Sequence, residues 1–220
     1  TEFLLRVLEL NRCSRILDLG CGRGRHAMIL NQKGYRVKGI DLSKQAIRAA
    51  RNKAENLGLK EISFEVRDMR DPLPEKFDAI VNLFTTFGYF HTDKENARVF
   101  DSVVHMLKPN GIFVLDYLNA SKVRSSYRAK DTGELQDFQY SISRYIQDDA
   151  IIKDIDFKGG RVGKVQSYSE RVKLYDLSWF KRNMGQRGLE IDHVFGDYEG
   201  NDFDAGTSPR LLIISRLRQR

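Results

Sequence analysis

The pattern of apolar and polar positions predicts strands that alternate with helices over the first half of the chain. Segments with the length and composition of strands occur at residues 16–19, 35–41, 62–67, 76–82 and 112–116. Ser43 is a favourable start for a helix over 44–57, and Thr92 with Glu95 forms a capping-box sequence that starts another helix. This alternation is typical of an α/β domain built on a parallel sheet.

Residues 120–174 depart from this alternation. Three segments there alternate as strands do, at residues 138–146, 151–157 and 162–172. The pair Gly159-Gly160 separates the last two, which predicts antiparallel strands joined by a turn. A helix and two strands are predicted afterwards, at residues 176–188, 189–195 and 210–215. We therefore expect one domain formed by residues 1–119 and 175–220, with a β-rich insertion at 120–174.

The most informative local motif is the glycine-rich turn between the first strand and the first helix. Asp18 lies at the end of the strand, and Gly20, Gly22 and Gly24 alternate with other residues before the helical pattern begins. Glycines allow a positive φ and let a ligand approach the backbone closely. The free N–H groups at a helix start attract polar or anionic groups. The turn therefore predicts a binding site for a nucleotide-like cofactor.

Two classes of cofactor compete for this turn. The segment 22–27 satisfies the G-x-G-x-x-G/A pattern of dinucleotide sites, and Asp41 follows Gly22 at a suitable distance in the chain. Asp18, however, places a carboxylate in the crevice, where it would repel a pyrophosphate and attract an ammonium group. The register Asp18-x-Gly20-x-Gly22-x-Gly24 resembles motif I of the class I S-adenosylmethionine (SAM)-dependent methyltransferases. The nicotinamide alternative also lacks a candidate hydride-transfer site.

The resemblance implies a cofactor site at the ends of successive strands. In that family, the acid matching Asp18 lies near the methionine part of SAM, and the acid matching Asp41 accepts the ribose hydroxyls. The residue matching Leu42 covers the adenine, and Asp68 matches the acid that contacts the adenine amino group. The predicted cofactor site as a whole comprises Asp18, Gly20, Cys21, Gly22, Gly24, Asp41, Leu42, Asp68, Met69, Asn82 and Leu83.

The same resemblance implies a doubly wound, Rossmann-like sheet of seven strands with the last strand antiparallel. It also implies that the insertion at 120–174, an antiparallel β-layer, covers the pocket for the methyl acceptor. A structural extension of the sheet or a dimer contact is the alternative. Family members commonly begin with a helical segment that closes over the cofactor. Here that segment is short, and we expect it to be truncated or disordered.

Missing motifs narrow the choice of acceptor. The chain has Asn82-Leu83-Phe84-Thr85 after the fourth strand, where methyltransferases of adenine amines or glutamine amides have [DN]-P-P-[YF]. No cysteine follows Cys21, although cytosine C5 methylation would need one. The acids do not cluster as in metal-dependent catechol enzymes, so no metal is predicted. The segment 82–90 resembles the small-molecule branch that includes sugar N-methyltransferases and uncharacterised bacterial members, which implies an amine or hydroxyl acceptor.

Tyr89 and His91 are the candidate catalytic residues, because they follow the fourth strand where the pocket of the family opens. A base is needed only when the acceptor arrives protonated, and a neutral imidazole can take a proton near pH 7. Each residue also fits a structural role, Tyr89 as a pocket wall and His91 as a surface residue before a helix. Tyr117, Arg144 and Arg210 are further candidates for lining the site.

The composition is that of an ordinary globular enzyme. The chain has 220 residues, of which 41% are hydrophobic, and a net charge of +7. No apolar run approaches the ~20 residues of a membrane span, and no signal-peptide pattern is present. Two cysteines do not suggest a disulfide framework, so we expect a cytoplasmic protein. Lys44, Arg48 and Arg51 share a helix face, but no RNA-binding motif accompanies them, and nucleic acid is not expected as a partner.

The sequence therefore predicts methyl transfer from SAM to a small-molecule acceptor, with S-adenosylhomocysteine as the product and no membrane partner. Three alternatives are kept: a methyltransferase of RNA or protein on the same fold, a SAM-binding protein without turnover, and a nicotinamide oxidoreductase. The identity of the acceptor and the oligomeric state, with a homodimer among the options, are open at this stage.

Overall fold

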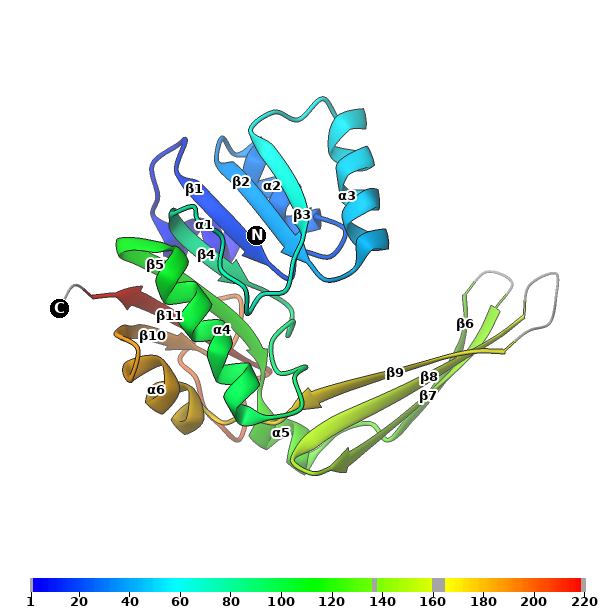
Figure 1. The fold of residues 1–220 in the computed structure, drawn as a ribbon. Helices are drawn as coiled ribbons and strands as arrows, with labels where there is room; N and C mark the ends of the chain where they lie inside the picture. The colour runs from blue at the N-terminus through cyan, green and yellow to red at the C-terminus, as the bar shows by residue number, and fades with distance from the viewer. Residues whose placement is uncertain (1, 136–137, 160–164, 219–220) are drawn as a thin grey trace.

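The fold has two sheets, and the computed structural model describes residues 2–135, 138–159 and 165–218 (Figure 1). In chain order the elements are α1 (Glu2–Leu8), β1 (Arg15–Leu19), α2 (Arg25–Gln32), β2 (Arg36–Asp41), α3 (Lys44–Asn56), β3 (Ile62–Val66), β4 (Phe77–Asn82), α4 (Asp93–Met106), β5 (Leu107–Leu118), α5 (Ala120–Ser125), β6 (Lys130–Leu135), β7 (Phe138–Gln147), β8 (Ala150–Gly159), β9 (Val165–Lys173), α6 (Leu177–Gly185), β10 (Leu189–Phe195) and β11 (Arg210–Leu217).

The larger sheet has seven strands in the order β10-β11-β5-β4-β1-β2-β3. Strands β1 to β5 pair in parallel, whereas β11 is antiparallel to both β5 and β10. The predicted Rossmann-like sheet with an antiparallel last strand is therefore confirmed. From β1 the chain builds outward through β2 and β3 and then returns to β4 on the other side of β1. In sheets of this kind, ligands bind at the carboxyl ends of the strands where the order reverses.

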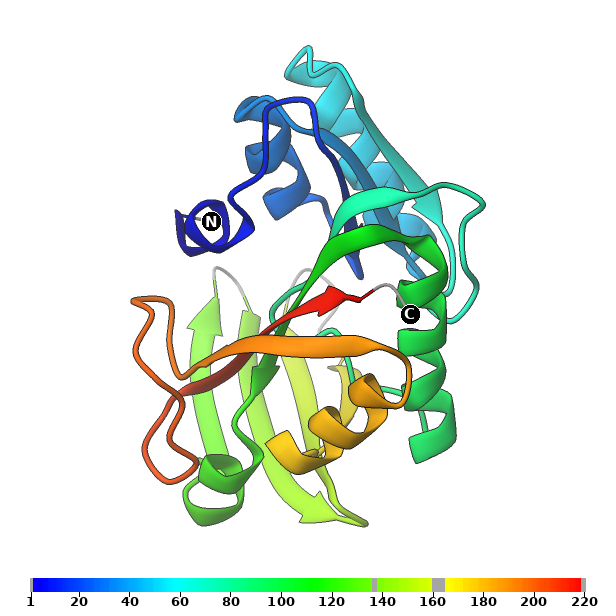
Figure 2. The same cartoon turned by 90° about the vertical axis from the view of Figure 1, so that its left-hand side faces the viewer.

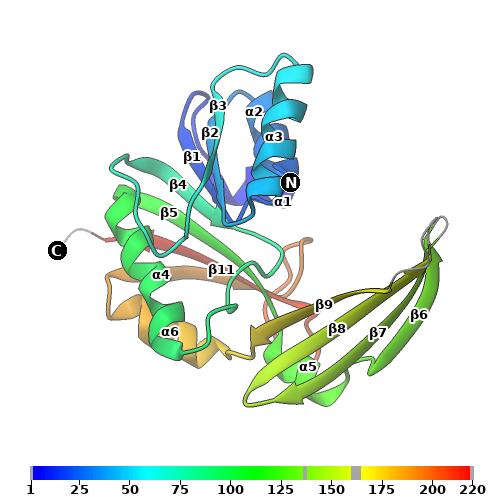
Figure 3. The ribbon, with the colours of Figure 1, turned by 45° about the vertical axis from the view of Figure 1, so that its right-hand side comes forward.

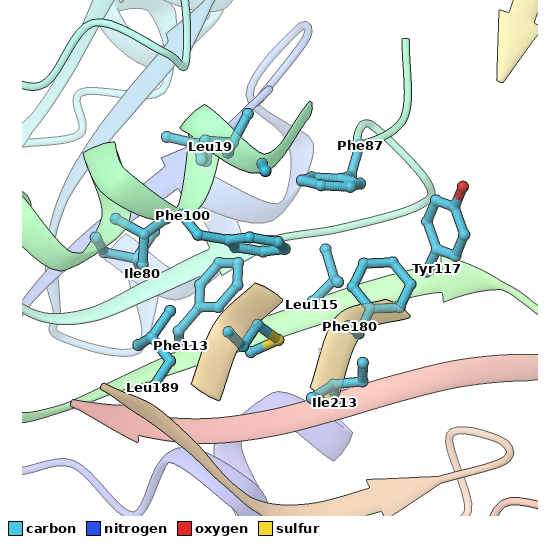
Figure 4. Close-up of a cluster of buried hydrophobic side chains, with 14 of the residues drawn as sticks. Leu19, Ile80, Phe87, Phe100, Phe113, Leu115, Tyr117, Phe180, Leu189 and Ile213 are labelled. Atoms are coloured by element: carbon cyan, nitrogen blue, oxygen red, sulfur yellow. The ribbon is translucent and has the colours of Figure 1, made fainter. Parts of the chain in front are cut away.

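Helices cover both faces of this sheet. On one face α1, α2 and α3 pack over a cluster that includes Ile16, Val37 and Val81. On the other face α4 and α6 enclose an aromatic cluster centred on Phe100. The ring of Phe100 lies 5.1 Å from that of Phe87 and 6.2 Å from that of Phe113, measured between centroids (Figure 4). These two layers fix the strand ends at which a ligand site is expected.

The insertion forms a separate antiparallel sheet in the order β6-β7-β8-β9, which projects from one end of the larger sheet (Figure 3). One face carries polar ladders, in which Ser167 and Ser169 donate to Asp156 and Asp154 at 2.6 Å. The strand β6 was not predicted, because its sequence is polar and lacks apolar alternation. Of the predicted turn and the following strand, Gly160 and residues 162–164 lie outside the described residues.

Two further segments differ from the sequence prediction. The structure contains α5, whose six residues are too few to give a helical period, although Asn119 caps it by accepting from the Ser121 and Lys122 N–H groups. The fifth strand, predicted at 112–116, extends over Leu107–Leu118 and contains an irregularity, where Asn110 has a φ of 59° and the pairing with β4 shifts register. Neither difference moves the strand ends that carry the predicted site.

The N-terminal segment is an ordered helix where it is described. Phe3, Leu4 and Leu8 of α1 are buried against the sheet. Arg6 donates to the carbonyl oxygens of Tyr198 and Glu199, so α1 lies next to the loop that joins β10 and β11 (Figure 2). The helix therefore forms part of the wall near the carboxyl end of β5.

We expect Phe100→Ala to lower the free energy of unfolding by about 3–5 kcal/mol, because it removes a fully buried ring from the aromatic cluster. The control is Tyr168→Ala on the inserted sheet, where the side chain is 55% exposed; its cost should be below about 1 kcal/mol. Denaturant titration measures both values. Similar losses in the two variants would contradict this description of the core.

Candidate functional site

The glycine turn has the positive-φ geometry that its sequence predicts. Gly20, Gly22 and Gly24 have φ values of 80°, 54° and 73°. The Gly20 and Cys21 N–H groups donate to the Ile40 oxygen at 2.8 and 2.9 Å, which ties the turn to β2. A Cβ atom on Gly20 would lie 2.8 Å from the Thr86 side chain, whereas one on Gly22 would meet no atom within 4 Å. Gly22 therefore faces the space that a ligand would use.

Two carboxylates lie beside this turn. Asp18 is 2% exposed, and its Oδ2 atom has no hydrogen-bond partner among the described residues. Burial, and then repulsion by Asp41, raise the pKa of Asp18 to about 7. Burial and the same two carboxylates raise the pKa of the Cys21 thiol, so this cysteine is not an activated nucleophile. A buried carboxylate with one oxygen unpartnered is stabilised by a cationic ligand.

Asp41 holds the turn and the next helix together. Its Oδ2 accepts from the Gly22 N–H at 2.9 Å, and its Oδ1 accepts from the Ser43 N–H at 2.8 Å. Leu42 follows it with a side chain that is 59% exposed. An exposed leucine next to a fixed carboxylate provides an apolar surface and a hydrogen-bond acceptor at the end of β2.

The residues after β3 are already paired with one another. Arg70 donates to both oxygens of Asp68 and to Glu95, and its guanidinium lies 3.9 Å from the centre of the Phe90 ring. Burial acts to raise the pKa of Asp68, but the hydrogen bonds from Arg70 outweigh it, and the pKa is lowered. Met69 packs against the core. Asp68 therefore has fewer free lone pairs than the sequence interpretation assumed.

Asn82 ends β4 in the buried interior. Its Nδ2 donates to the Leu19 oxygen at 2.6 Å and to Thr86 Oγ1 at 2.8 Å, while its Oδ1 has no partner among the described residues. Leu83 follows as a buried residue. The ends of β1 and β4 are thus joined by a side-chain amide, which fixes the crevice between them.

The loop after β4 contains two consecutive non-glycine residues in the left-handed region. Phe84 and Thr85 have φ values of 56° and 58°, a conformation that costs about 1–3 kcal/mol for each such residue. The Phe84 N–H donates to the side-chain Oδ2 of Asp116, and the Thr85 N–H donates to the main-chain carbonyl oxygen of Asp116. Both distances are 2.9 Å. Strain of this kind persists only where surrounding contacts fix the backbone, and it concentrates at functional sites.

Asp116, at the carboxyl end of β5, is the centre of those contacts. Arg210 donates to its Oδ1 from Nε at 2.9 Å and from Nη2 at 2.6 Å, and the Tyr198 hydroxyl donates to its Oδ2 at 2.8 Å. Sequence reasoning identified Arg210 as a candidate lining residue but missed Tyr198 and Phe84. No local signal connects them, because Tyr198 and Arg210 lie 82 and 94 positions from Asp116 in the chain.

The two candidate catalytic residues, Tyr89 and His91, both follow β4 but differ in their surroundings. Tyr89 is 45% exposed, and burial together with Glu170 of β9 raises the pKa of its hydroxyl. His91 is exposed and immediately precedes the cap of α4. The Tyr89 hydroxyl therefore stays protonated at neutral pH, where it can donate a hydrogen bond.

The remaining candidates have structural roles in the described chain. Tyr117 is fully buried, and its hydroxyl donates to the Lys173 oxygen, which fastens β5 to the end of β9. Arg144 lies on the inserted sheet and donates to the Arg128 oxygen.

In the described part of the chain, no group of three or more His, Cys, Asp or Glu residues could hold a metal ion. None of the described helices is long and apolar enough to cross a membrane.

Comparisons with known proteins agree with this geometry. A family profile described as a methyltransferase domain matches residues 10–166. The protein YqeM of Bacillus subtilis (strain 168), which has a provisional methyltransferase name, is 31% identical over 207 residues, covering 90% of this chain and 82% of YqeM.

Two other similarities are informative. The dTDP-3-amino-3,4,6-trideoxy-alpha-D-glucopyranose N,N-dimethyltransferase of Streptomyces venezuelae is 31% identical over 104 residues, which cover 47% of this chain and 42% of that enzyme. A SAM-dependent methyltransferase from Clostridium acetobutylicum ATCC 824 has a similar structure, with a TM-score of 0.87 and 20% identity over 99% of this chain and 90% of that one. At this identity, the structural match supports the fold.

We expect Asp18→Asn to increase stability, and the gain should grow with pH. In the wild type, Asp18 ionises near pH 4 when unfolded and near pH 7 when folded. Between these values the unfolded chain binds fewer protons, so stability falls as pH rises, by up to about 4 kcal/mol in all. The variant lacks this loss. Denaturant titrations from acidic to mildly alkaline pH measure the difference, and parallel curves for the two proteins would refute it.

Proposed function

This chain belongs to the methyltransferase-domain family, and we propose that it transfers a methyl group from SAM to an amine or hydroxyl of a small-molecule acceptor. The SAM site in this proposal is the edge formed by the ends of β1, β2 and β4. The observation that carries it is the buried, unpartnered oxygen of Asp18 beside the open face of Gly22.

The residues at this edge fit SAM. When bound, SAM supplies a methyl group activated by a positively charged sulfur. Asp18 would hold the ammonium group of the methionine part, and this contact would return the carboxylate to its ionised form. Gly22 leaves room for the cofactor to lie against the backbone. Leu42 would cover one face of the adenine.

Asp41 would receive the ribose hydroxyls on lone pairs that its two backbone donors leave free. Each carboxylate oxygen can accept more than one hydrogen bond, and the Gly22 and Ser43 N–H groups hold the side chain in place. Asp68 would accept from the adenine amino group only where Arg70 leaves a lone pair. Cys21, Gly20 and Gly24 contribute backbone to the turn, and Met69, Asn82 and Leu83 form the remaining walls in this proposal.

A nicotinamide dinucleotide fits this edge poorly. Its pyrophosphate would lie near Asp18 and Asp41, whose mutual repulsion already raises the pKa of Asp18. Adding two further negative charges would increase that repulsion.

The acceptor is proposed from the chain's own loop and from its relatives. Asn82-Leu83-Phe84-Thr85 lacks the proline pair that holds adenine amines and glutamine amides. A relative that is 31% identical over about half of this chain is named as a methyltransferase of an amino sugar. His91 is the proposed base for an acceptor that arrives protonated, and Tyr89 would orient the acceptor by hydrogen bonds. A resident metal is not part of this proposal.

The inserted sheet is proposed as the cover of the acceptor pocket. Its Glu170 lies close enough to influence Tyr89, and the Lys173 N–H donates to the Gly88 oxygen at 2.9 Å, so β9 is attached to the loop after β4. A homodimer through this sheet and a cytoplasmic location stay predictions.

SAM affinity should depend on pH through Asp18. Because Asp18 must be ionised to hold the ammonium group, affinity should fall by up to about tenfold per unit as pH drops below about 7. Asp18→Asn should weaken binding about 10- to 100-fold and remove this pH dependence. Calorimetric titration of both proteins with SAM, S-adenosylhomocysteine and NADH at several pH values measures these affinities. Binding of NADH alone would contradict the proposed cofactor.

Asp41→Asn should also weaken binding of both adenosyl ligands, because one of the two carboxylate oxygens becomes a donor. Thermal unfolding of this variant serves as the control, since Asp41 also fixes the turn. Loss of affinity with an intact fold would assign Asp41 to the ribose. Unchanged affinity would remove it from the site.

Methyl transfer should appear as S-adenosylhomocysteine that forms only when a small amine or alcohol is added. The screen compares compact primary amines and alcohols with a short RNA and a peptide under the same conditions. Formation with RNA or peptide alone would favour those alternatives. Tight SAM binding with no product from any acceptor class would favour a binding protein without turnover.

A further inference from the structure

A small cavity lies on the side of the sheet covered by α1 and α2, under the strained Phe84. Its volume is about 80 Å³, enough for about five water molecules. Its wall includes Phe3 and Leu4 of α1, His26 of α2, Asp116 of β5, Phe84 and Tyr198. Among the residues assigned to the cofactor, only Leu83 lines the cavity in the described chain, so the two sites adjoin without coinciding.

Several of the rings that line this cavity contact one another. The His26 ring stacks on Phe84 with centroids 4.8 Å apart and 19° between planes, and Phe84 lies 6.0 Å from Tyr198. The Tyr198 ring in turn lies 6.2 Å from Phe3. Phe84 is 52% exposed although it sits at the junction of these rings. Such an exposed ring, held by a strained backbone, suits a wall against which a ligand packs.

The polar groups of the cavity offer hydrogen-bond acceptors and little net charge. The Asp116 carboxylate is neutralised by Arg210, and it also accepts from the Phe84 N–H and the Tyr198 hydroxyl. The Tyr198 oxygen keeps a lone pair after this donation. A neutral imidazole at His26 keeps one unprotonated ring nitrogen as a second acceptor.

The charges around His26 favour an uncharged occupant. Burial and then the neighbouring Arg25 lower the pKa of His26 to about 4, although Asp116 acts in the opposite direction. Arg25 also lies with its guanidinium 5.2 Å from the centre of the Phe84 ring, which lines the cavity. Surroundings that keep an imidazole neutral also favour the neutral form of an amine that enters them.

We propose that this cavity binds the reacting end of the acceptor, a compact uncharged amine that donates its N–H groups to His26 and Tyr198. A primary amine has two such donors and keeps its lone pair free, which is the form needed to attack a methyl group. A hydroxyl has one donor and would leave one of the two acceptors unmatched. The inference rests on the proposed function and revises it in two respects. The acceptor narrows from amine or hydroxyl to amine, and His26 and Tyr198, in place of Tyr89, hold the reacting group. An amine that arrives uncharged needs no base, so His91 has no part in this form of the reaction.

The test uses three fluorinated probes and the full chain. The probes are 2,2,2-trifluoroethylamine, which is uncharged near neutral pH, 2,2,2-trifluoroethanol, and 3-fluoropropylamine, which is a cation at that pH. Fluorine NMR line broadening reports their binding, with and without S-adenosylhomocysteine. The variant is His26→Phe, which keeps a stacked ring but removes both nitrogens. Its matched control is His193→Phe, where an exposed histidine stacks on Phe195 at 5.7 Å outside the cavity.

Broadening of the trifluoroethylamine signal by the wild type and His193→Phe, reduced at least several-fold in His26→Phe, is the expected result. Stronger binding of trifluoroethanol or of the cationic amine, equal binding by His26→Phe, or no binding of trifluoroethylamine to the wild type would overturn the proposal. Calorimetry with S-adenosylhomocysteine separates the two levels of inference. If trifluoroethylamine binds in the predicted pattern while S-adenosylhomocysteine does not bind, the cavity assignment holds and the proposed cofactor site fails.

Discussion

The ion pair between Asp116 and Arg210 holds together the end of the sheet on which the site depends. Asp116 lies near the carboxyl end of β5 and Arg210 begins β11, so the pair joins these two antiparallel strands. The same carboxylate accepts from the Phe84 N–H and the Tyr198 hydroxyl. Removing one partner of a buried pair leaves an uncompensated charge, which costs about 3–5 kcal/mol. The left-handed loop after β4 persists because of this pair.

Asp18 has the opposite character, although it also ends a central strand. It is buried as deeply as Asp116 but forms no ion pair in the described part of the chain, and repulsion by Asp41 adds to the effect of burial on its pKa. The folded chain therefore retains an unfavourable carboxylate where a hydrophobic residue would be more stable. Retained instability of this kind is expected where a ligand, and not the fold, supplies the compensating charge.

The sequence predicts those features whose residues lie close together in the chain. The glycine turn, the strand ends at Asp18 and Asp41, and the capping box at Thr92 each lie within a few residues, and the structure has them. The strand β6 was missed because a polar edge strand has no apolar period. The grouping of Asp116, Tyr198 and Arg210 was missed because it forms only when β11 returns beside β5.

The contrast between the two buried carboxylates suggests why one sheet edge can serve two ligands of different charge. Methyl transfer from a sulfonium needs a cationic donor and an acceptor whose lone pair is free. At the end of β1, an unpaired acid favours a cation. At the end of β5, an acid already paired with Arg210 contributes hydrogen bonds without net charge, and Arg25, which lies against the Phe84 ring, would disfavour a second cation there. In the proposed function, the pairing state of each carboxylate, more than its presence, would set which ligand it receives.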